Sequence, residues 1–287
     1  MAGPAGACRV RGVVTHAISV ERERQVVVKR YLDARRGEAV REWRALRLLA
    51  EHAPRLAPEP ISADLDADPP VIVMSLLPGE PLGSGPLSAG QQDALAMALG
   101  RLWQSVPVRL VTPVSGEVDV QANLVQLARD LAVAAEPDPG GDPVVHEAVV
   151  HGTSWLARTV RLASVGDSRA APDIPRVLGQ GDANLANFLW DGELVRIVDF
   201  EDSGVSDRAF ELAVLVEHIS AWWDAGLDGE KFVSAFDLTA AERGWLADWR
   251  RLAALYWLLR LQPGGGSAGH LLPGTLRRQA ERLLAQL

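Results

Sequence analysis

The stretch of residues 179–200, GQGDANLANFLWDGELVRIVDF, constrains the fold more than any other part of the chain. FLW and LVRIVDF have the composition of two short strands, and the Asp191-Gly192 pair between them is the strongest short signal for a β-hairpin. A hairpin returns the chain to the end from which it departed. We therefore expect Asp199 to lie close to Asn187.

The same hairpin places one more carboxylate, that of Asp182, in the loop beside Asn187 and Asp199. Such a set suits phosphoryl transfer, because one carboxylate can accept the proton of a hydroxyl while an amide oxygen and a second carboxylate hold Mg²⁺. The spacing D-x-x-x-x-N, followed by D-F at the end of a strand, is typical of kinase catalytic sites. We assign Asp182 as the catalytic base and Asn187 and Asp199 as metal ligands. The alternative interpretation is an Asx-rich loop that only leads into a hairpin.

A lysine is unusual in this chain and therefore informative. Of the 29 basic residues only Lys29 and Lys231 are lysines. Lys29 lies in QVVVKRY, a β-branched run that predicts a strand, and its ammonium group is a compact point charge that a planar guanidinium does not reproduce. A functional role is therefore the favoured interpretation of Lys29, and a chance position is the alternative.

The order of the predicted elements indicates an α+β protein of two lobes. ACRVRG, HAISVE and QVVVKRY predict strands, RRGEAVREWRALRLLAEHAP predicts a helix and VIVMSLL a buried strand. They form a small nucleotide-binding lobe over residues 1–77. The Gly/Pro-rich connector LPGEPLGSGPLSAG leads into a mostly helical lobe over residues 78–287. Its segments include SAGQQDALAMALGRLWQSV, with Ser88 as N-cap, and AFELAVLVEHISAWWDAG, which we expect to be one helix.

Composition and missing motifs exclude several classes of protein. Neither a Walker A sequence nor a G-x-G-x-x-G occurs, and the single Cys8 excludes an intramolecular disulfide and a Cys-rich zinc site. The net charge of −8 argues against a nucleic-acid partner. The N-terminus lacks the apolar run of a secretory signal, and the longest apolar run, LAALYWLLRL, is interrupted by Arg260, so we expect no membrane partner and a cytoplasmic location. The oligomeric state stays open.

These motifs, in this order and over most of the chain, resemble the aminoglycoside phosphotransferase and choline kinase family. The resemblance implies the protein-kinase-like fold, Mg²⁺, and ATP or GTP as phosphoryl donor. It implies that Lys29 contacts the phosphates, with Glu42 as its carboxylate partner. VIVMSLLPGEPL is similar to the linker whose backbone meets adenine, which makes Met74, Ser75 and Leu77 nucleotide-binding candidates.

Two departures from the family pattern concern the nucleotide and the catalytic loop. The nucleotide loop lacks the usual paired glycines and has Thr15 and His16 as its candidate contacts. Gln180 precedes Gly-Asp where the family usually has His, and Gln keeps donor and acceptor capacity without titrating.

Glu201 is a candidate for supporting the metal, or it pairs with Arg208 in a structural role.

The acceptor site is expected in the helical lobe. Trp222, Trp223 and Asp224 are its candidates, because they follow the catalytic segment on a predicted helix. The segment 199–249 has twelve acidic and three basic residues, which favours an acidic wall that attracts a cationic acceptor. Neutral nucleoside or sugar antibiotics are the alternative acceptors.

The sequence therefore predicts a kinase that phosphorylates a hydroxyl of a small molecule. An antibiotic, with resistance by phosphorylation, is the favoured acceptor. A metabolic acceptor (a sugar, a choline-like alcohol or an amino-alcohol) is the first alternative, and a catalytically inactive nucleotide-binding module is the second. A protein substrate is disfavoured, because no A-P-E segment follows D-F.

Overall fold

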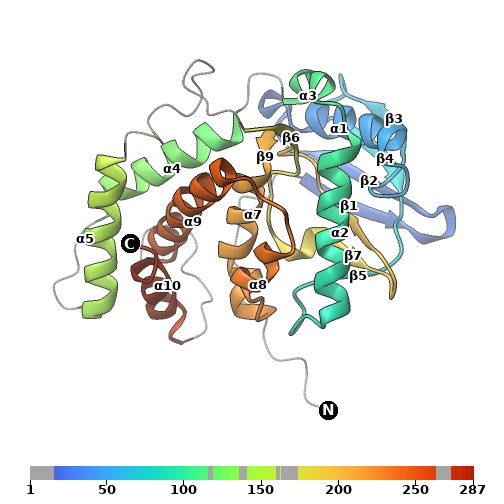
Figure 1. The fold of residues 1–287 in the computed structure, drawn as a ribbon. Coiled ribbons are helices and arrows are strands. Elements are labelled where there is room, and N and C mark those ends of the chain that lie inside the picture. The colour runs from blue at the N-terminus through green and yellow to red at the C-terminus, as the bar shows by residue number, and fades with distance from the viewer. Residues whose placement is uncertain (1–15, 116–118, 136–140, 160–161, 163–173, 263–272) are drawn as a thin grey trace, which may run out of the picture.

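The computed structural model describes residues 16–115, 119–135, 141–159, 162, 174–262 and 273–287. A small antiparallel sheet with one covering helix lies on one side, and a larger, mostly helical part lies on the other (Figure 1). The predicted α+β architecture of two unequal parts is confirmed. The predicted strand ACRVRG lies outside the described residues.

The small sheet has the strand order β1-β2-β4-β3, with all neighbours antiparallel. Its strands are β1 (His16–Glu21), β2 (Val26–Tyr31), β3 (Pro60–Asp64) and β4 (Val71–Ser75). The short 3₁₀ helices η1 (Arg22–Arg24) and η2 (Ala34–Arg36) flank β2. In this central strand β-branched residues alternate between the two faces, and Lys29 pairs with Ile72 of β4. The pleat puts Lys29 and Tyr31 on one face.

Helix α1 (Glu38–His52) packs against β3 and β4. Its buried side chains recur three and four residues apart, which is the pattern of a helix with one face on a sheet. They are Glu38, Ala39, Arg41, Glu42, Ala45, Leu46 and Leu49. Glu42 thus belongs to the buried stripe although it is charged.

Strand β3 is a finding that the sequence pattern did not predict. The segment PEPISAD is not among the strands predicted from the sequence, but it pairs with β4 at the edge of the sheet. Most of its residues are exposed, so it shows neither an apolar run nor an apolar alternation. Backbone pairing with β4 makes it a strand, and side-chain patterning cannot report that.

The helical part is built around α9, which packs against α7, α4, α10 and α5. Ser88 forms a capping box with Gln91 at the start of α2, as predicted. The helices are α2 (Ala89–Ser105), α3 (Val108–Ser115), α4 (Val120–Ala134), α5 (Pro143–Arg158), α7 (Arg208–Glu217), α8 (Gly229–Ser234), α9 (Ala240–Leu261) and α10 (Thr275–Leu284). None of the helices in the described residues is long and apolar enough to span a membrane.

Two small sheets carry the central segment 176–207. The predicted hairpin is confirmed: β7 (Phe188–Trp190) pairs with β8 (Val195–Ile197), and β5 (Glu80–Pro81) extends the sheet beyond β7. Asp191 accepts the backbone N–H groups of Glu193 and Leu194, which closes the turn. Strands β6 (Arg176–Gly179) and β9 (Gly204–Asp207) form a second ladder. The 3₁₀ helix η3 (Leu185–Asn187) lies between β6 and β7.

The expected single helix over AFELAVLVEHISAWWDAG is wrong. Helix α7 ends at Glu217, and the π-helix η4 (Ser220–Asp224) follows. His218 explains the break, because its ring nitrogen Nδ1 accepts the backbone N–H of Ser220 at 3.1 Å. A side chain thus takes the place of a backbone acceptor at this point.

Candidate active site

Lys29 and Glu42 meet in the interior of the small lobe. Lys29 Nζ lies 2.7 Å from Glu42 Oε2, and the Tyr31 hydroxyl donates to the same carboxylate oxygen. The Lys29 and Glu42 side chains are 3% and 1% exposed. The pleat of β2 and the buried stripe of α1 bring these residues together, so the predicted pair exists in the structure.

Helix α1 also holds the segment that follows β8. The Arg41 guanidinium donates to the carbonyl oxygen of Glu201 at 2.9 Å, and the Phe200 N–H donates to Glu42 at 3.3 Å. Asp199 has a φ of 63°, a left-handed conformation that few residues other than Gly and Asn adopt. The position of the Asp199 carboxylate thus depends on contacts with the small lobe.

Lys29 contacts two carboxylates of this segment in addition to Glu42. Its ammonium group is ion-paired with Asp199 Oδ1, and it lies 2.9 Å from Glu201 Oε2. Burial alone would lower the pKa of Lys29, but the three carboxylates outweigh burial and raise it. Lys29 is therefore a permanent cation at the point where the two lobes meet.

The catalytic loop folds around Asp182. Asn187 Nδ2 donates to Asp182 Oδ2 at 2.9 Å, and the Asn184 N–H donates to Asp182 Oδ1 at 3.1 Å. Asn184 itself caps η3 by accepting the Ala186 N–H. Burial raises the pKa of Asp182, and the nearby negative charges of Asp199 and Glu201 raise it further. The two hydrogen bonds lower this pKa, but their effect is smaller. A raised pKa makes this carboxylate a better proton acceptor.

Gln180 joins the catalytic loop to the metal segment. Its amide nitrogen donates to the carbonyl oxygens of Asp199 at 2.7 Å and Val198 at 3.2 Å, and its amide oxygen accepts the Asp182 N–H at 2.8 Å. The side chain is buried and uses both ends of the amide. Gln180 is thus a positioning residue for Asp182 and Asp199.

The predicted magnesium ligands suit a hard divalent cation by the chemistry of their donor atoms. Asn187 uses its amide nitrogen for Asp182, which leaves its amide oxygen as a ligand atom. Val198 donates its N–H to the Asn187 carbonyl at 2.9 Å, so Asp199 follows directly on a residue bonded to Asn187. Carboxylate and amide oxygens are the ligands that Mg²⁺ takes in proteins.

The other nucleotide-binding candidates lie in or next to the small sheet. Met74 and Ser75 end β4, and Leu77 follows it. His16 begins β1, and its Nδ1 lies 2.7 Å from Glu201 Oε2; ligand atoms of His16, Asp199 and Glu201 lie within 4.8 Å of one another. Thr15 lies outside the described residues.

Glu201 does not pair with Arg208, the structural alternative considered for it. Arg208 instead forms a two-point ion pair with Glu242 of α9, at 2.8 Å for both hydrogen bonds. Glu201 faces Lys29 and His16, because the Arg41 contact turns this segment toward the small lobe.

Trp222, Trp223 and Asp224 all lie in the π-helix η4, and each is partly buried. The two indoles meet edge to face with their ring centroids 5.5 Å apart. The guanidinium of Arg282 lies 4.9 Å from the Trp222 ring, and that of Arg278 lies 4.7 Å from the Trp223 ring. Both indoles thus contact arginines of α10.

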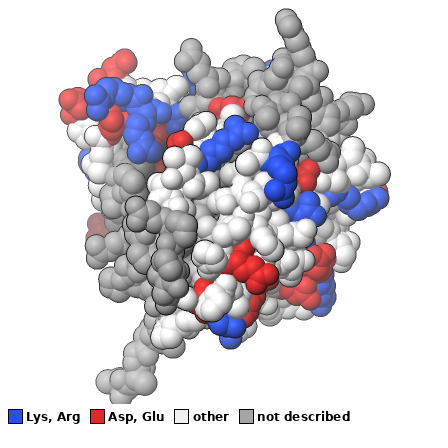
Figure 2. All heavy atoms as spheres, turned by 90° about the vertical axis from the view of Figure 1, so that its left-hand side faces the viewer, with Lys and Arg blue, Asp and Glu red and all other residues white. Residues whose placement is uncertain are grey.

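The segment 199–249 does not form the expected acidic wall, because most of its carboxylates form ion pairs or hydrogen bonds with other groups of the protein. Asp207 and Asp228 cap helices. Further pairs include Glu211 with Ser206 and the Gln180 N–H, Glu217 with Arg250 and Arg282, Glu230 with Arg250, Glu242 with Arg208, Asp248 with Arg251, and Asp202 with Arg41. Figure 2 shows acidic and basic groups occurring together on the side that faces left in Figure 1.

Sequence patterns did not single out Ser220, whose hydroxyl touches the catalytic loop. The Leu185 N–H donates to Ser220 Oγ at 3.0 Å, and Ser220 Oγ lies 2.7 Å from His218 Nδ1. The His218 ring in turn meets the Trp257 ring edge to face, with centroids 4.8 Å apart. The only signal in the sequence was a His-x-Ser inside an otherwise apolar helix pattern.

A two-lobed fold with a Lys-Glu pair, a D-x-x-x-x-N loop and an Asp at the lobe junction has the features of a kinase. The model of the phosphotransferase enzyme family matches residues 15–255, and the chain belongs to this family. It is an enzyme of the small-molecule kinase type. A comparison with curated proteins finds no match.

Several solved structures share the fold at low identity. A choline/ethanolamine kinase family protein from Mesorhizobium loti is 18% identical with a TM-score of 0.59, covering 99% of this chain and 89% of that one. An aminoglycoside phosphotransferase in complex with gentamicin is 16% identical, with a TM-score of 0.57 and coverage of 95% and 86%. A spectinomycin phosphotransferase in complex with ADP and spectinomycin is 14% identical, with a TM-score of 0.56 and coverage of 91% and 86%.

Proposed function

We propose that the enzyme transfers the γ-phosphoryl group of ATP to a hydroxyl of a small molecule. The observation that carries this proposal is the convergence of three segments. Lys29 of β2 contacts Glu42 of α1 and Asp199 after β8, while Asn187 binds Asp182 in the loop joined to Asp199 through Gln180.

In this proposal Lys29 positions the phosphates, and Glu42 holds the lysine in place. When a nucleotide binds, phosphate oxygens can replace the contacts that Lys29 makes with Asp199 and Glu201. Glu42 is more deeply buried and keeps its contact, because leaving a buried carboxylate without its cation is costly. The backbone around Met74, Ser75 and Leu77 is proposed to receive adenine.

Asp182 is proposed to accept the proton of the acceptor hydroxyl. Two hydrogen bonds fix its carboxylate, and burial raises its pKa. Both features suit a group that orients a hydroxyl and takes up its proton as the oxygen–phosphorus bond forms.

Asn187 and Asp199 are the residues proposed to hold Mg²⁺. When bound, the ion neutralises charge on the phosphates. The protein contributes the placement of the two oxygen ligands, through the Asn187–Asp182 hydrogen bond and the Gln180–Asp199 hydrogen bond.

An antibiotic is the favoured acceptor, and resistance by phosphorylation the favoured role in a bacterial cytoplasm. Family membership and the fold shared with antibiotic phosphotransferases support it. The choline/ethanolamine kinase with the same fold supports the alternative of a metabolic alcohol or amino-alcohol. ATP is favoured over GTP, because the related structures hold ADP or ATP.

The test is ATP consumption by the wild-type enzyme and by Asp182→Asn, against a panel of antibiotics and hydroxylated metabolites. General-base assistance is worth roughly 10²–10⁴ in rate. We expect kcat of Asp182→Asn to fall by that factor, with the dissociation constant for Mg-ATP nearly unchanged.

Asp199→Asn is the informative companion variant, because it should weaken Mg²⁺-dependent ATP binding as well as turnover. An inactive nucleotide-binding module would give no acceptor-dependent turnover with the wild type and equal ATP binding in both variants. An Asp182→Asn enzyme with nearly wild-type turnover would remove Asp182 from its proposed role.

A further inference from the structure

The π-helix η4 lies beside the catalytic loop. The Leu185 N–H donates to Ser220 Oγ at 3.0 Å, and η3 and η4 are close neighbours in the fold. Leu185 is three residues beyond Asp182. An acceptor whose hydroxyl reaches Asp182 therefore has η4 within reach of the rest of its structure.

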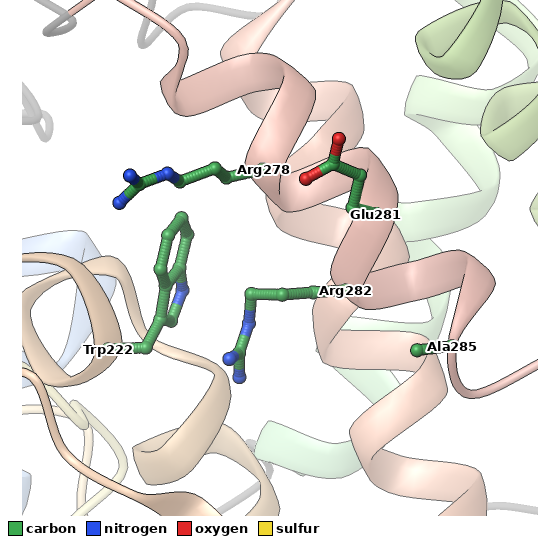
Figure 3. A pocket seen from close by; sticks show the side chains of 5 residues that line it. All are labelled: Trp222, Arg278, Glu281, Arg282 and Ala285. Carbon is green, nitrogen blue, oxygen red and sulfur yellow. The ribbon is translucent and has the colours of Figure 1, made fainter.

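A groove of about 430 Å³ opens between η4 and α10. Trp222 lines it on one side, and Arg278, Glu281, Arg282 and Ala285 line it on the other. Figure 3 shows the Trp222 indole opposite the two arginines, with both guanidinium groups directed toward its side of the groove. The groove thus combines a flat aromatic surface with cationic groups.

The charges of the groove leave a positive balance. The Arg282 guanidinium is paired with Glu217 at 2.7 Å, and Glu281 is paired with Arg277 at 3.1 Å. Arg278 is exposed and has no carboxylate partner among the residues that the structure describes. Arg278 would repel a positively charged ligand, and the carboxylates nearby are already paired with arginines.

The end of α9 carries a further arginine, Arg260, beside Tyr256. The Arg260 guanidinium lies 5.9 Å from the Tyr256 ring centroid, and it has no ion pair in the described part of the chain. Burial raises the pKa of Tyr256. The charge of Arg260 opposes this shift, and the charge of Asp182 adds to it. Tyr256 is therefore within electrostatic reach of Asp182.

We propose that the groove between Trp222 and α10 binds part of the acceptor, and that this part is flat and either uncharged or anionic. This inference rests on the proposed function and narrows its substrate class: polycationic aminoglycosides are poor acceptors, and neutral nucleoside-like or anionic aromatic molecules with a free hydroxyl are good ones. An indole face binds a flat group by stacking, while Arg278 attracts negative charge and repels positive charge.

The experiment measures phosphoryl transfer to four acceptors: gentamicin, choline, a neutral nucleoside and a hydroxymethyl-substituted aromatic carboxylate. We expect the wild type to have lower KM values for the nucleoside and the carboxylate than for gentamicin. Arg278→Glu should raise KM for the carboxylate about two- to fivefold, the range of an exposed ion pair, and lower it for gentamicin. Added salt should raise KM for the carboxylate and hardly affect the nucleoside.

Arg35→Glu is the matched control, because Arg35 is an exposed arginine of the small lobe and lies outside the groove. It should leave all four KM values unchanged. If gentamicin is the best acceptor and Arg278→Glu alters no KM, the inference is overturned while the proposed function stands.

Calorimetric binding of the same acceptors without ATP separates the two ideas. If the wild type binds ATP but phosphorylates none of the four, the proposed function loses its support for these acceptors. Carboxylate binding that Arg278→Glu weakens would still support the groove, and binding that is absent or unaffected by the variant would overturn it.

Discussion

The side-chain amide of Gln180 donates to the carbonyl oxygen of Asp199 at 2.7 Å, across 19 positions of the chain. The oxygen of the same amide accepts the Asp182 N–H. One neutral side chain therefore fixes the distance between the proposed base and a proposed metal ligand. An amide can fill both roles because it has a donor at one end and an acceptor at the other.

Replacing Gln180 by Ala should lower both stability and turnover. The change leaves the Asp182 N–H and the Asp199 carbonyl without this partner, and an unsatisfied buried polar group costs about 1–3 kcal/mol. Chemical denaturation should show a loss of that size, together with a fall in kcat. Gln126→Ala is the control: Gln126 is exposed and donates to the exposed Asp130 side chain, so its loss should stay within about 0.5 kcal/mol.

Lys29→Arg should impair turnover although the positive charge is kept. The Lys29 side chain is almost fully buried among three carboxylates, and a larger planar guanidinium cannot occupy the same point. A displacement that costs the transition state about 1.4 kcal/mol lowers kcat about tenfold. Steady-state kinetics should show a fall of at least that size, whereas exposed Lys231→Arg should match the wild type. Equal kcat in both variants would contradict the role given to Lys29.

Gly181→Ala should distort the catalytic loop. Gly181 has a φ of +87°, and an added Cβ would lie 2.2 Å from the carbonyl oxygen of Asp202. Because backbone atoms on both sides must move, we expect a lower melting temperature and loss of most activity. Gly100→Ala in α2 meets no atom within 4 Å and should stabilise the protein by about 0.5–1 kcal/mol. A Gly181→Ala enzyme with normal activity would show that the loop tolerates this shift.

Ser220→Ala should lower kcat while ATP affinity stays the same. The Leu185 N–H loses its acceptor, so the catalytic loop is held less firmly, whereas the small lobe is untouched. Ser220→Thr keeps the hydroxyl and should restore most of kcat. Ser234→Ala, which removes an exposed hydroxyl that donates to the Lys231 carbonyl, is the control. If the Ala and Thr variants lose activity equally, the hydroxyl does not position the loop.

The protein should lose stability in mild acid, because the folded state resists protonation of the buried His218 side chain. Burial lowers the pKa of His218 from 6.5 to about 4. The unfolded chain therefore takes up a proton at a higher pH than the folded chain, and stability is lost as the pH falls from about 6.5 toward 4. Between pH 7.5 and 5 this one group accounts for about 2 kcal/mol.

The measurement is the free energy of unfolding at both pH values for the wild type and for His218→Gln, because other titrating groups cancel in the comparison. The wild type should lose about 2 kcal/mol more than His218→Gln. Replacing exposed His146 by Gln should leave the pH dependence as in the wild type. Equal losses in the wild type and His218→Gln would show that His218 is not buried in its neutral form.

The local features of this protein could be predicted from its sequence. The Asp191-Gly192 turn, the β-branched run around Lys29 and the apolar spacing of the helices each depend on neighbouring residues, so their period and turn chemistry are visible in the chain. The hairpin then brings Asn187 and Asp199 together by topology alone. That relation was sufficient to predict the type of chemistry.

Contacts between side chains of distant segments depend instead on how the elements pack in three dimensions. Glu201 faces Lys29 because Arg41 of α1 holds its backbone, and Ser220 reaches Leu185 because His218 ends α7. Two carboxylates of the segment expected to form an acidic wall are buried instead: Glu242 is paired with Arg208 of α7, and Glu217 is paired with Arg250 of α9 and Arg282 of α10. Burial and ion pairing depend on how whole elements pack, and charge counted along a sequence does not reveal which partner each group has in the fold.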